Sequence, residues 1–399
     1  MIYQKILKNN INYFTYAFIF SSSLLMMKNI LITGSSFLYS NNTKLNILLI
    51  LLTVFIYFYA IYKEKHFIIN IRAMFILILI FIFWLVTFCF NTSLLAYSYV
   101  LEDIQSFMIY SIPAFLFLPL VDDYNELMNI LYKIRYLFLA VLLFTLFLIF
   151  FNGVVQGSGS RYMSYSMAFG RALILPTIVF ISSWFNKGNI FDLFCSGLFC
   201  LSIVLIGSRF PLLCIGSFIL IKLFFNLKNN PKKTLLFLSL LLIIFIFLIF
   251  GGTYINNVFN LIFSKFGIRS RGLSILLSGN LGTDSGRFII YEELISQLNK
   301  HPFLGYGAFG GIVALNNGLS HSLILDIFSN LGYLGGVLFL LWFISRFAKL
   351  WKSSKNNMSK KEYILICICM FAPICLIQSS LWSANYLWYL LVMPLKSKS

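Results

Sequence analysis

Histidine is scarce in this sequence, and one histidine stands where it could perform acid–base chemistry. The 399 residues include only 3 His. Imidazole titrates near neutral pH, so histidine is the commonest general base in proteins. His66 lies in a short basic linker between Lys63, Lys65 and an apolar run, and we discard it. His321 opens an apolar run and is the first candidate base, while His301, directly before Pro302, is the second.

Arginine and lysine are distributed differently along the chain. Apolar runs divide the sequence, and counting them from a cytoplasmic N-terminus places 20 of the 30 basic residues on the inner side, as the positive-inside rule requires. The outer side keeps 6 of the 9 Arg but only 4 of the 21 Lys. Guanidinium is a planar fork that matches phosphate oxygens. The outer arginines therefore predict an anion site; they are Arg161, Arg171, Arg209, Arg269, Arg271 and Arg287.

The spacing around His321 is the most specific pattern in the chain. His321-Ser322 is followed by nine residues, Gly332, two residues and Gly335. This resembles the signature of the O-antigen ligases, which the related O-antigen polymerases carry in looser form. The glycines lie inside an apolar run, where small residues permit close helix contact. We expect them to fix the angle of His321 by packing.

Two further segments strengthen this resemblance. Arg287 follows Ser285-Gly286, and the turn 301–307 (HPFLGYG) comes next, as in the outer loop of the same superfamily. The segment 207–213 (GSRFPLL), which contains Arg209, resembles its Ser-Arg element at a helix end. The resemblance covers about residues 200–345, with its three elements in the expected order.

The resemblance implies a glycosyltransferase of the O-antigen or capsule polymerase type in the bacterial inner membrane. Such an enzyme transfers a glycan from undecaprenyl pyrophosphate to the hydroxyl of another lipid-linked repeat unit, at the periplasmic face. One alternative is an O-antigen ligase, whose acceptor is the lipid A core. A second is a flippase that transports lipid-linked oligosaccharide, although polar residues here concentrate in one outer loop instead of lining a path. A chain-length regulator and a flippase are the implied protein partners, besides membrane lipid.

The resemblance also assigns roles to residues. His321 would assist the acceptor hydroxyl, and Arg287 and Arg209 would hold the charged parts of the substrates. The expected substrate-binding residues are Arg161, Arg171, Arg269, Arg271, His301 and Asp326. Structural alternatives stay open: His321 as a polar cap, arginines that snorkel to the interface, and Asp326 within an outer polar layer. We find no metal motif, no nucleotide fingerprint and no carboxylate cluster, and expect neither metal nor cofactor.

Composition predicts the elements that must position these residues. Hydrophobic residues make up 60% of the chain and charged residues 11%, with a mean hydropathy of +0.90. Soluble domains are roughly 45–50% apolar and roughly 25% charged. The net charge of +18 comes mostly from lysines in short linkers, so it indicates topology and not nucleic-acid binding. The seven cysteines lie in apolar runs and predict neither disulfides nor metal ligands.

We therefore predict an all-α polytopic membrane protein, 1–399 being a single integral membrane domain with both termini cytoplasmic. A long periplasmic loop, 252–320, contains a short amphipathic helix at about 287–300 that ends at His301-Pro302. The sequence predicts about 12 transmembrane helices, each about long enough for a ~30 Å hydrocarbon core. They lie at about 11–27, 45–62, 73–90, 104–120, 136–152, 168–184, 190–206, 211–227, 234–251, 321–344, 363–379 and 381–395.

Overall fold

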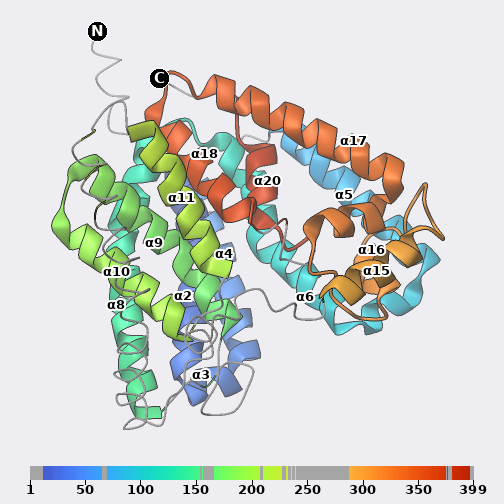
Figure 1. Ribbon diagram of the computed structural model, residues 1–399, viewed down its shortest axis with the longest axis horizontal. Coiled ribbons are helices and arrows are strands. Elements are labelled where there is room, and N and C mark those ends of the chain that lie inside the picture. The colour runs from blue at the N-terminus through green and yellow to red at the C-terminus, as the bar shows by residue number, and fades with distance from the viewer. Residues whose placement is uncertain are drawn as a thin grey trace. The chain divides into compact units, whose positions relative to one another are not determined.

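The computed structural model describes residues 12–64, 70–152, 166–206, 210–226, 287–373 and 380–395, with single positions at 155, 231, 235, 239 and 375. These residues form helices and turns and contain no strand (Figure 1). The predicted ninth span, 234–251, and the loop before residue 287 lie outside them, apart from the single positions 235 and 239. An all-helical chain is what the apolar runs required, because helices satisfy their own backbone hydrogen bonds.

Seven helical segments of the described residues are long and apolar enough to cross a membrane. This finding agrees with a polytopic membrane protein. The seven are α2 (Tyr13–Gly34), α4 (Asn42–Glu64), α5 (Ile71–Phe90), the continuous segment Ser98–Leu120, α8 (Tyr124–Asn152), α9 (Met167–Lys187) and α17 (Leu323–Ser353).

The other described helices are shorter. Two of them are apolar, α10 (Ile190–Ile206) and α11 (Phe210–Asn226). The predicted span at 381–395 contains only the eight-residue α20 (Asn385–Val392), which covers about 12 Å, less than half of a ~30 Å hydrocarbon core. The remaining ones are α3 (Ser36–Ser40), η2 (Thr92–Ala96), α15 (Arg287–Leu298), α16 (Gly310–Ala314) and α18 (Met358–Phe371).

Two predicted spans begin earlier than hydropathy indicated. The fourth starts at Ser98, not at 104, and passes through α6 (Ser98–Ser106), η3 (Phe107–Ser111), α7 (Ile112–Phe117) and η4 (Leu118–Leu120). It therefore includes the buried Asp103. The fifth starts at Tyr124, not at 136, and Asp123 accepts the backbone N–H of Asn125 at 2.8 Å, as expected of a helix cap.

The chain divides into two compact units. The first comprises Met1–Ser23, Ile47–Ile130 and Asp284–Ser399, and the second comprises Leu24–Asn46 and Leu131–Thr283. The core of the first unit is an aromatic cluster of Trp84, Phe107, Phe309, Trp382 and Trp388, in which neighbouring ring centroids lie 5.1–6.1 Å apart. Each ring is at most 5% exposed. The cluster joins α5, η3, α20 and the turn before α16.

The second unit is centred on α9, which packs against α10 and α11 and is buried along nearly its whole length. A buried ion pair holds α8 to α10, with Arg135 Nη2 3.0 Å from Asp192 Oδ1. Ser183 of α9 donates to the same carboxylate at 2.7 Å, and the Tyr136 ring lies 4.3 Å from the guanidinium. A buried charge pair is stable only when its remaining hydrogen-bonding groups are satisfied, as they are here.

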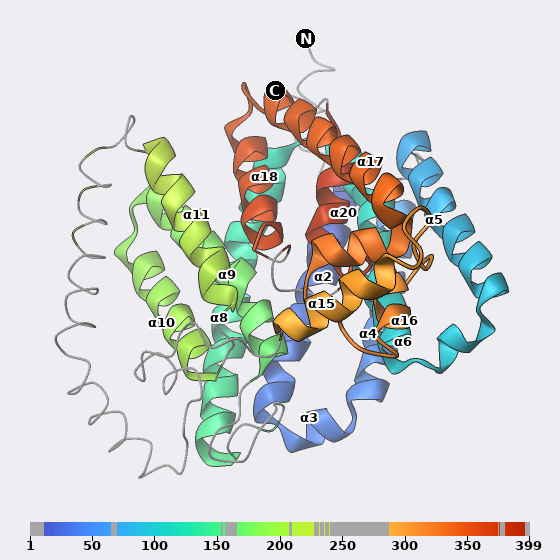
Figure 2. The ribbon, with the colours of Figure 1, turned by 45° about the vertical axis from the view of Figure 1, so that its right-hand side comes forward.

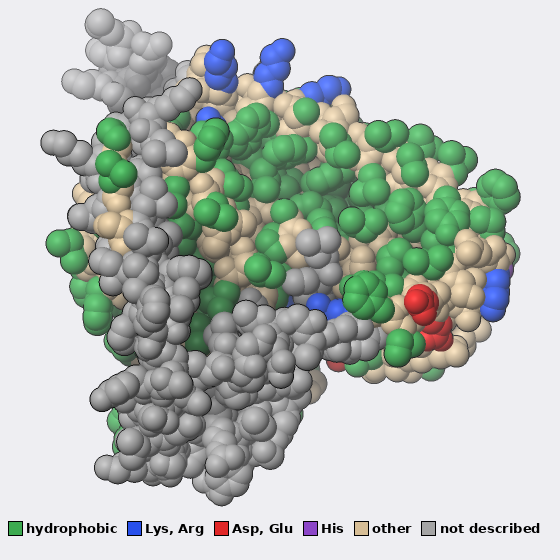
Figure 3. Space-filling model, viewed as in Figure 1, with side chains coloured by type: hydrophobic (Ala, Val, Ile, Leu, Met, Phe, Trp, Pro, Cys, Tyr) green, Lys and Arg blue, Asp and Glu red, His purple; other side chains and the backbone are tan. Residues whose placement is uncertain are grey.

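The outward surface of α17 is apolar. Leu334, Val337, Leu338 and Leu341 are 46–63% exposed, and Figure 3 shows hydrophobic side chains spread over this part of the molecule. A soluble protein rarely exposes so large an apolar patch, whereas a membrane-spanning helix requires one.

Candidate functional site

His321 lies at the start of α17, and its backbone is strained. Ser322 is the N-cap of α17, and its hydroxyl accepts the N–H of Leu325 at 3.4 Å. The residue before it, His321, has φ +50°, in the left-handed region that few non-glycine residues adopt. Strained backbone of this kind persists only where surrounding contacts enforce it, and it clusters at functional sites. His321 is thus not itself the cap, and its side chain is partly exposed.

Gly332 lies within α17, after His321, and interrupts the helix. Its φ of +70° and ψ of 178° are not helical, so α17 consists of two helices joined at this point. The turn that follows α15 fills the interruption: Tyr306 N–H donates to Ser329 O at 2.8 Å, and Tyr333 N–H donates to Pro302 O at 2.7 Å. In Figures 1 and 2, α15 and α16 lie beside the first part of α17 in both views.

The glycines of the two motifs belong to one contact. A Cβ atom on Gly332 would collide with the carbonyl of Phe303, and one on Gly305 or Gly310 would collide with that of Ser329. Gly305 also has φ +64°. The turn 302–310 and the break in α17 therefore fit backbone to backbone. We expected Gly332 to serve helix packing, but its partner is this turn.

Helix α15 carries Arg287 toward the same region. Its buried side runs through Leu294 and Leu298, each 1% exposed, which confirms the predicted amphipathic helix. Tyr291 lies on the adjoining face, and its hydroxyl donates to the carbonyl of His321 at 3.0 Å. Arg287 is one turn before Tyr291, so both share a face of the helix. The structure thus brings Arg287 and His321 to adjoining elements.

Asp326 lies one turn into α17, below His321, and is buried. The side chain is 2% exposed, and its Oδ2 accepts the N–H of Leu381 at 2.7 Å and the amide of Asn330 at 3.0 Å. Asn330 in turn accepts the N–H of Gly310 at 3.0 Å. This carboxylate therefore joins α17 to the turn before α20 and, through Asn330, to α16.

Asp103 is a neighbour of Asp326 that sequence reasoning missed. It is 7% exposed on α6 and hydrogen-bonds to Ser380 and Ser383, in the turn that also contacts Asp326. The two carboxylates are close enough to interact electrostatically. A carboxylate within an apolar run would have been the signal, because such residues tend to mark functional pathways. Starting the helix at residue 104 left Asp103 outside it.

The second candidate histidine, His301, is a residue of the turn. It is exposed, and its ring centroid lies 4.5 Å from that of Tyr306. Partial desolvation raises the pKa of the Tyr306 phenol, which keeps the hydroxyl protonated as a donor to the carbonyl of Gln297 at 3.2 Å. His301 therefore supports the turn that fills the break at Gly332; its predicted contact with substrate is not tested.

Of the remaining predicted arginines, the structure describes only Arg171. Arg171 lies in the second unit on α9, and its Nε has no hydrogen-bond partner among the residues that the structure describes. Arg161, Arg209, Arg269 and Arg271 lie outside the described residues, so their roles stay predictions. The described part of the chain contains no group of three His, Cys, Asp or Glu residues placed to hold a metal ion.

The described residues form an all-helical structure with several helices long and apolar enough to cross a membrane, which agrees with a polytopic membrane protein. Residues 194–340 match the family model described as O-antigen ligase, so this part of the chain is similar to that family. The matched region runs from α10 through α15 and α16 to the second part of α17. No curated protein and no solved structure gives a significant match to the chain.

Proposed function

We propose that the protein is an O-antigen or capsular repeat-unit polymerase. It would transfer a glycan from undecaprenyl pyrophosphate to a hydroxyl of a second lipid-linked repeat unit, at the periplasmic face of the inner membrane. The family match supports a ligase-type or polymerase-type glycosyltransferase in general. The proposal rests mainly on one observation. Arg287 and Tyr291 lie on one face of α15, and Tyr291 donates a hydrogen bond to the carbonyl of His321 at the start of α17.

The chemistry requires a base and a cation at separate points. The acceptor hydroxyl attacks the anomeric carbon of the donor glycan, and the bond from that carbon to the pyrophosphate oxygen breaks. His321 takes the hydroxyl proton, and undecaprenyl pyrophosphate leaves with the electron pair. Arg287 stabilises the charge on the departing pyrophosphate, because a guanidinium forks onto phosphate oxygens. The donor is already activated by its pyrophosphate, so the reaction needs no nucleotide.

A ligase that transfers the chain to lipid A core is the second candidate. The model that matches is described as O-antigen ligase, and the spacing from His321 to Gly332 and Gly335 fits that signature. The two reactions share the donor and the bond that breaks, and they differ only in the acceptor. The same base and cation would serve both.

Deleting the gene separates these candidates. Surface polysaccharide is resolved by gel, and carrier-linked glycan is extracted in parallel. Loss of a polymerase leaves core lipid capped with single repeat units, whereas loss of a ligase leaves long chains on the carrier and bare core. Loss of a flippase strands single units inside the cell. Capped core supports the proposal, and either of the other two patterns contradicts it.

A further inference from the structure

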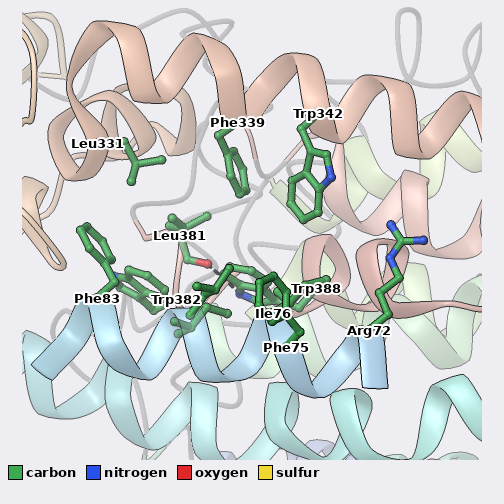
Figure 4. Close-up of a pocket in the computed structure, with 12 residues that line it drawn as sticks. Arg72, Phe75, Ile76, Phe83, Leu331, Phe339, Trp342, Leu381, Trp382 and Trp388 are labelled. Carbon is green, nitrogen blue, oxygen red and sulfur yellow. Dashed lines mark hydrogen bonds between the residues drawn. The ribbon is translucent and has the colours of Figure 1, made fainter. Parts of the chain in front are cut away.

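An apolar groove runs between α5 and the second part of α17. Its volume is about 570 Å³, within the range of small-molecule sites of roughly 300–1,000 Å³. Phe339 and Trp342 point into it from α17, and Phe75 and Phe83 point into it from α5 (Figure 4). All of the lining residues belong to the first unit. Phe75 and Trp342 remain 61% and 37% exposed, so the groove is open at its side.

One end of the groove is cationic. Arg72, exposed at the first turn of α5, stands there in Figure 4. Arg346 follows Trp342 by one turn of α17 and is 5% exposed. The two charges are close enough to repel each other. Among the described residues, neither guanidinium has a salt bridge to a carboxylate.

The buried guanidinium is only partly satisfied. Arg346 donates from Nε to Leu391 O at 3.1 Å and from Nη2 to Met393 O. Its Nη1 is buried and has no hydrogen-bond partner among the residues that the structure describes. An unpaired buried donor on a charged group costs free energy that an anion would recover. A phosphate held by Arg72 at this end of the groove would also relieve the repulsion between Arg72 and Arg346.

The length of the groove matches one leaflet of a bilayer. Arg72 and Phe83 are 11 residues apart on α5, which corresponds to about 16 Å of helix. This is about half of a ~30 Å hydrocarbon core. A chain that enters at the level of Arg72 would thus reach about to the middle of the membrane. The arginine end is the one that the basic residues predict to be cytoplasmic, where anionic lipids are concentrated.

We propose that this groove is a binding site for one anionic glycerophospholipid of the adjoining leaflet, with its phosphate on Arg72, beside the buried charge of Arg346, and an acyl chain along Phe75, Phe83, Phe339 and Trp342. The site is separate from His321 and Arg287 and does not depend on the proposed transferase activity. Leu381 lines the groove and also donates its backbone N–H to the carboxylate of Asp326. The lipid therefore lies against the same turn that supports the buried carboxylate below His321.

Native mass spectrometry of the full chain in detergent tests the charge requirement. The probes are phosphatidylglycerol and phosphatidylcholine with identical acyl chains. Arg72→Gln removes a cation that is exposed, so the fold should survive, and we expect about a tenfold loss of phosphatidylglycerol affinity. Lys349→Gln, an exposed cation on α17 away from the groove lining, is the matched control and should leave the affinity unchanged. Equal affinities of the two variants would overturn the proposal.

A pair of neighbouring substitutions on α5 tests the acyl chain. Leu79 and Ile78 are 49% and 50% exposed, but only Leu79 lines the groove. Leu79→Trp should fill the groove and weaken phosphatidylglycerol binding at least about fivefold, while Ile78→Trp should not. Polyprenyl phosphate is added as a competitor in the same measurement. If it displaces phosphatidylglycerol at a lower concentration than a second phosphatidylglycerol does, the occupant is the carrier lipid and the proposal is wrong.

Discussion

Replacing Gly332 by alanine should disable the site through the backbone alone. The residue has φ +70° and ψ 178°, a region that is essentially restricted to glycine and costs about 1–3 kcal/mol for other residues. A Cβ atom would also collide with the carbonyl of Phe303. Since backbone cannot move aside as a side chain can, the turn 302–310 must separate from α17. We expect a total loss of about 3 kcal/mol or more in this contact.

The displaced turn would carry α15 and the hydrogen bond from Tyr291 to His321 with it, so chain growth should fail. The assays are thermal unfolding in detergent and polysaccharide length on a gel. Gly335→Ala is the matched control, because its Cβ would meet only the Cβ of Leu331, at 3.0 Å. That variant should unfold near the wild-type temperature and retain product. If Gly332→Ala behaves like Gly335→Ala in both assays, the account of the break is refuted.

Three further substitutions test individual contacts. Tyr291→Phe removes the hydrogen bond to the His321 carbonyl, which is worth about 1 kcal/mol. Turnover should therefore fall roughly fivefold while protein abundance stays unchanged. An unchanged rate would show that Tyr291 does not belong to the site. Asp326→Ala leaves the N–H of Leu381 unpaired and removes one of the two hydrogen bonds of the Asn330 amide, which should cost about 1–3 kcal/mol of stability. Asp326→Asn keeps one accepting oxygen and should cost less; the reverse order in thermal unfolding would contradict this. Burial lowers the pKa of Lys360 to about 8. As the pH rises, the folded protein therefore loses the Lys360 proton before the unfolded chain does. The free energy of unfolding should rise between about pH 8 and 10.5, by on the order of 2 kcal/mol. Lys360→Met should remove that rise, and an identical pH profile in both proteins would show that another group causes it.

The sequence predicted the features that depend on local composition. The apolar runs located α4, α5, α9 and α10 to within a few residues, because crossing a hydrocarbon core requires a long unbroken apolar helix. They located the start of α2, which ends at Gly34 and not at 27. The amphipathic pattern located α15, and His301-Pro302 marked its end. All seven cysteines are free, as their apolar surroundings indicated.

The features that the sequence did not predict depend on tertiary contact. Gly332 lies in an apolar run, where glycine ordinarily permits helices to approach, and only the turn at 302–310 makes a break in the helix favourable. Asp103 was excluded from its helix because a carboxylate lowers the hydropathy, yet Ser380 and Ser383 hydrogen-bond to it there. Ser380 and Ser383 are both more than 270 residues from Asp103 along the chain, beyond the range of any local pattern.

The roles of the site residues stay predictions, but their positions in the structure can be compared with the expectation. His321, Arg287 and the turn 301–307 were expected to act together, and the structure brings them to adjoining elements. The sequence could not show that Tyr291 connects them, because a tyrosine on an amphipathic helix has no distinctive pattern. It also could not show that the carbonyl of His321, and not its ring, accepts that bond.

Polysaccharide synthesis by His321→Ala tests the central claim most directly. The variant is expressed in the deletion strain, its abundance in the membrane is matched to that of the wild-type protein, and surface and carrier-linked glycans are resolved on a gel. In the proposed mechanism His321 would accept the proton of the attacking hydroxyl in either candidate reaction, so we predict the pattern of the deletion strain. Full-length surface polysaccharide made by His321→Ala would contradict the assignment.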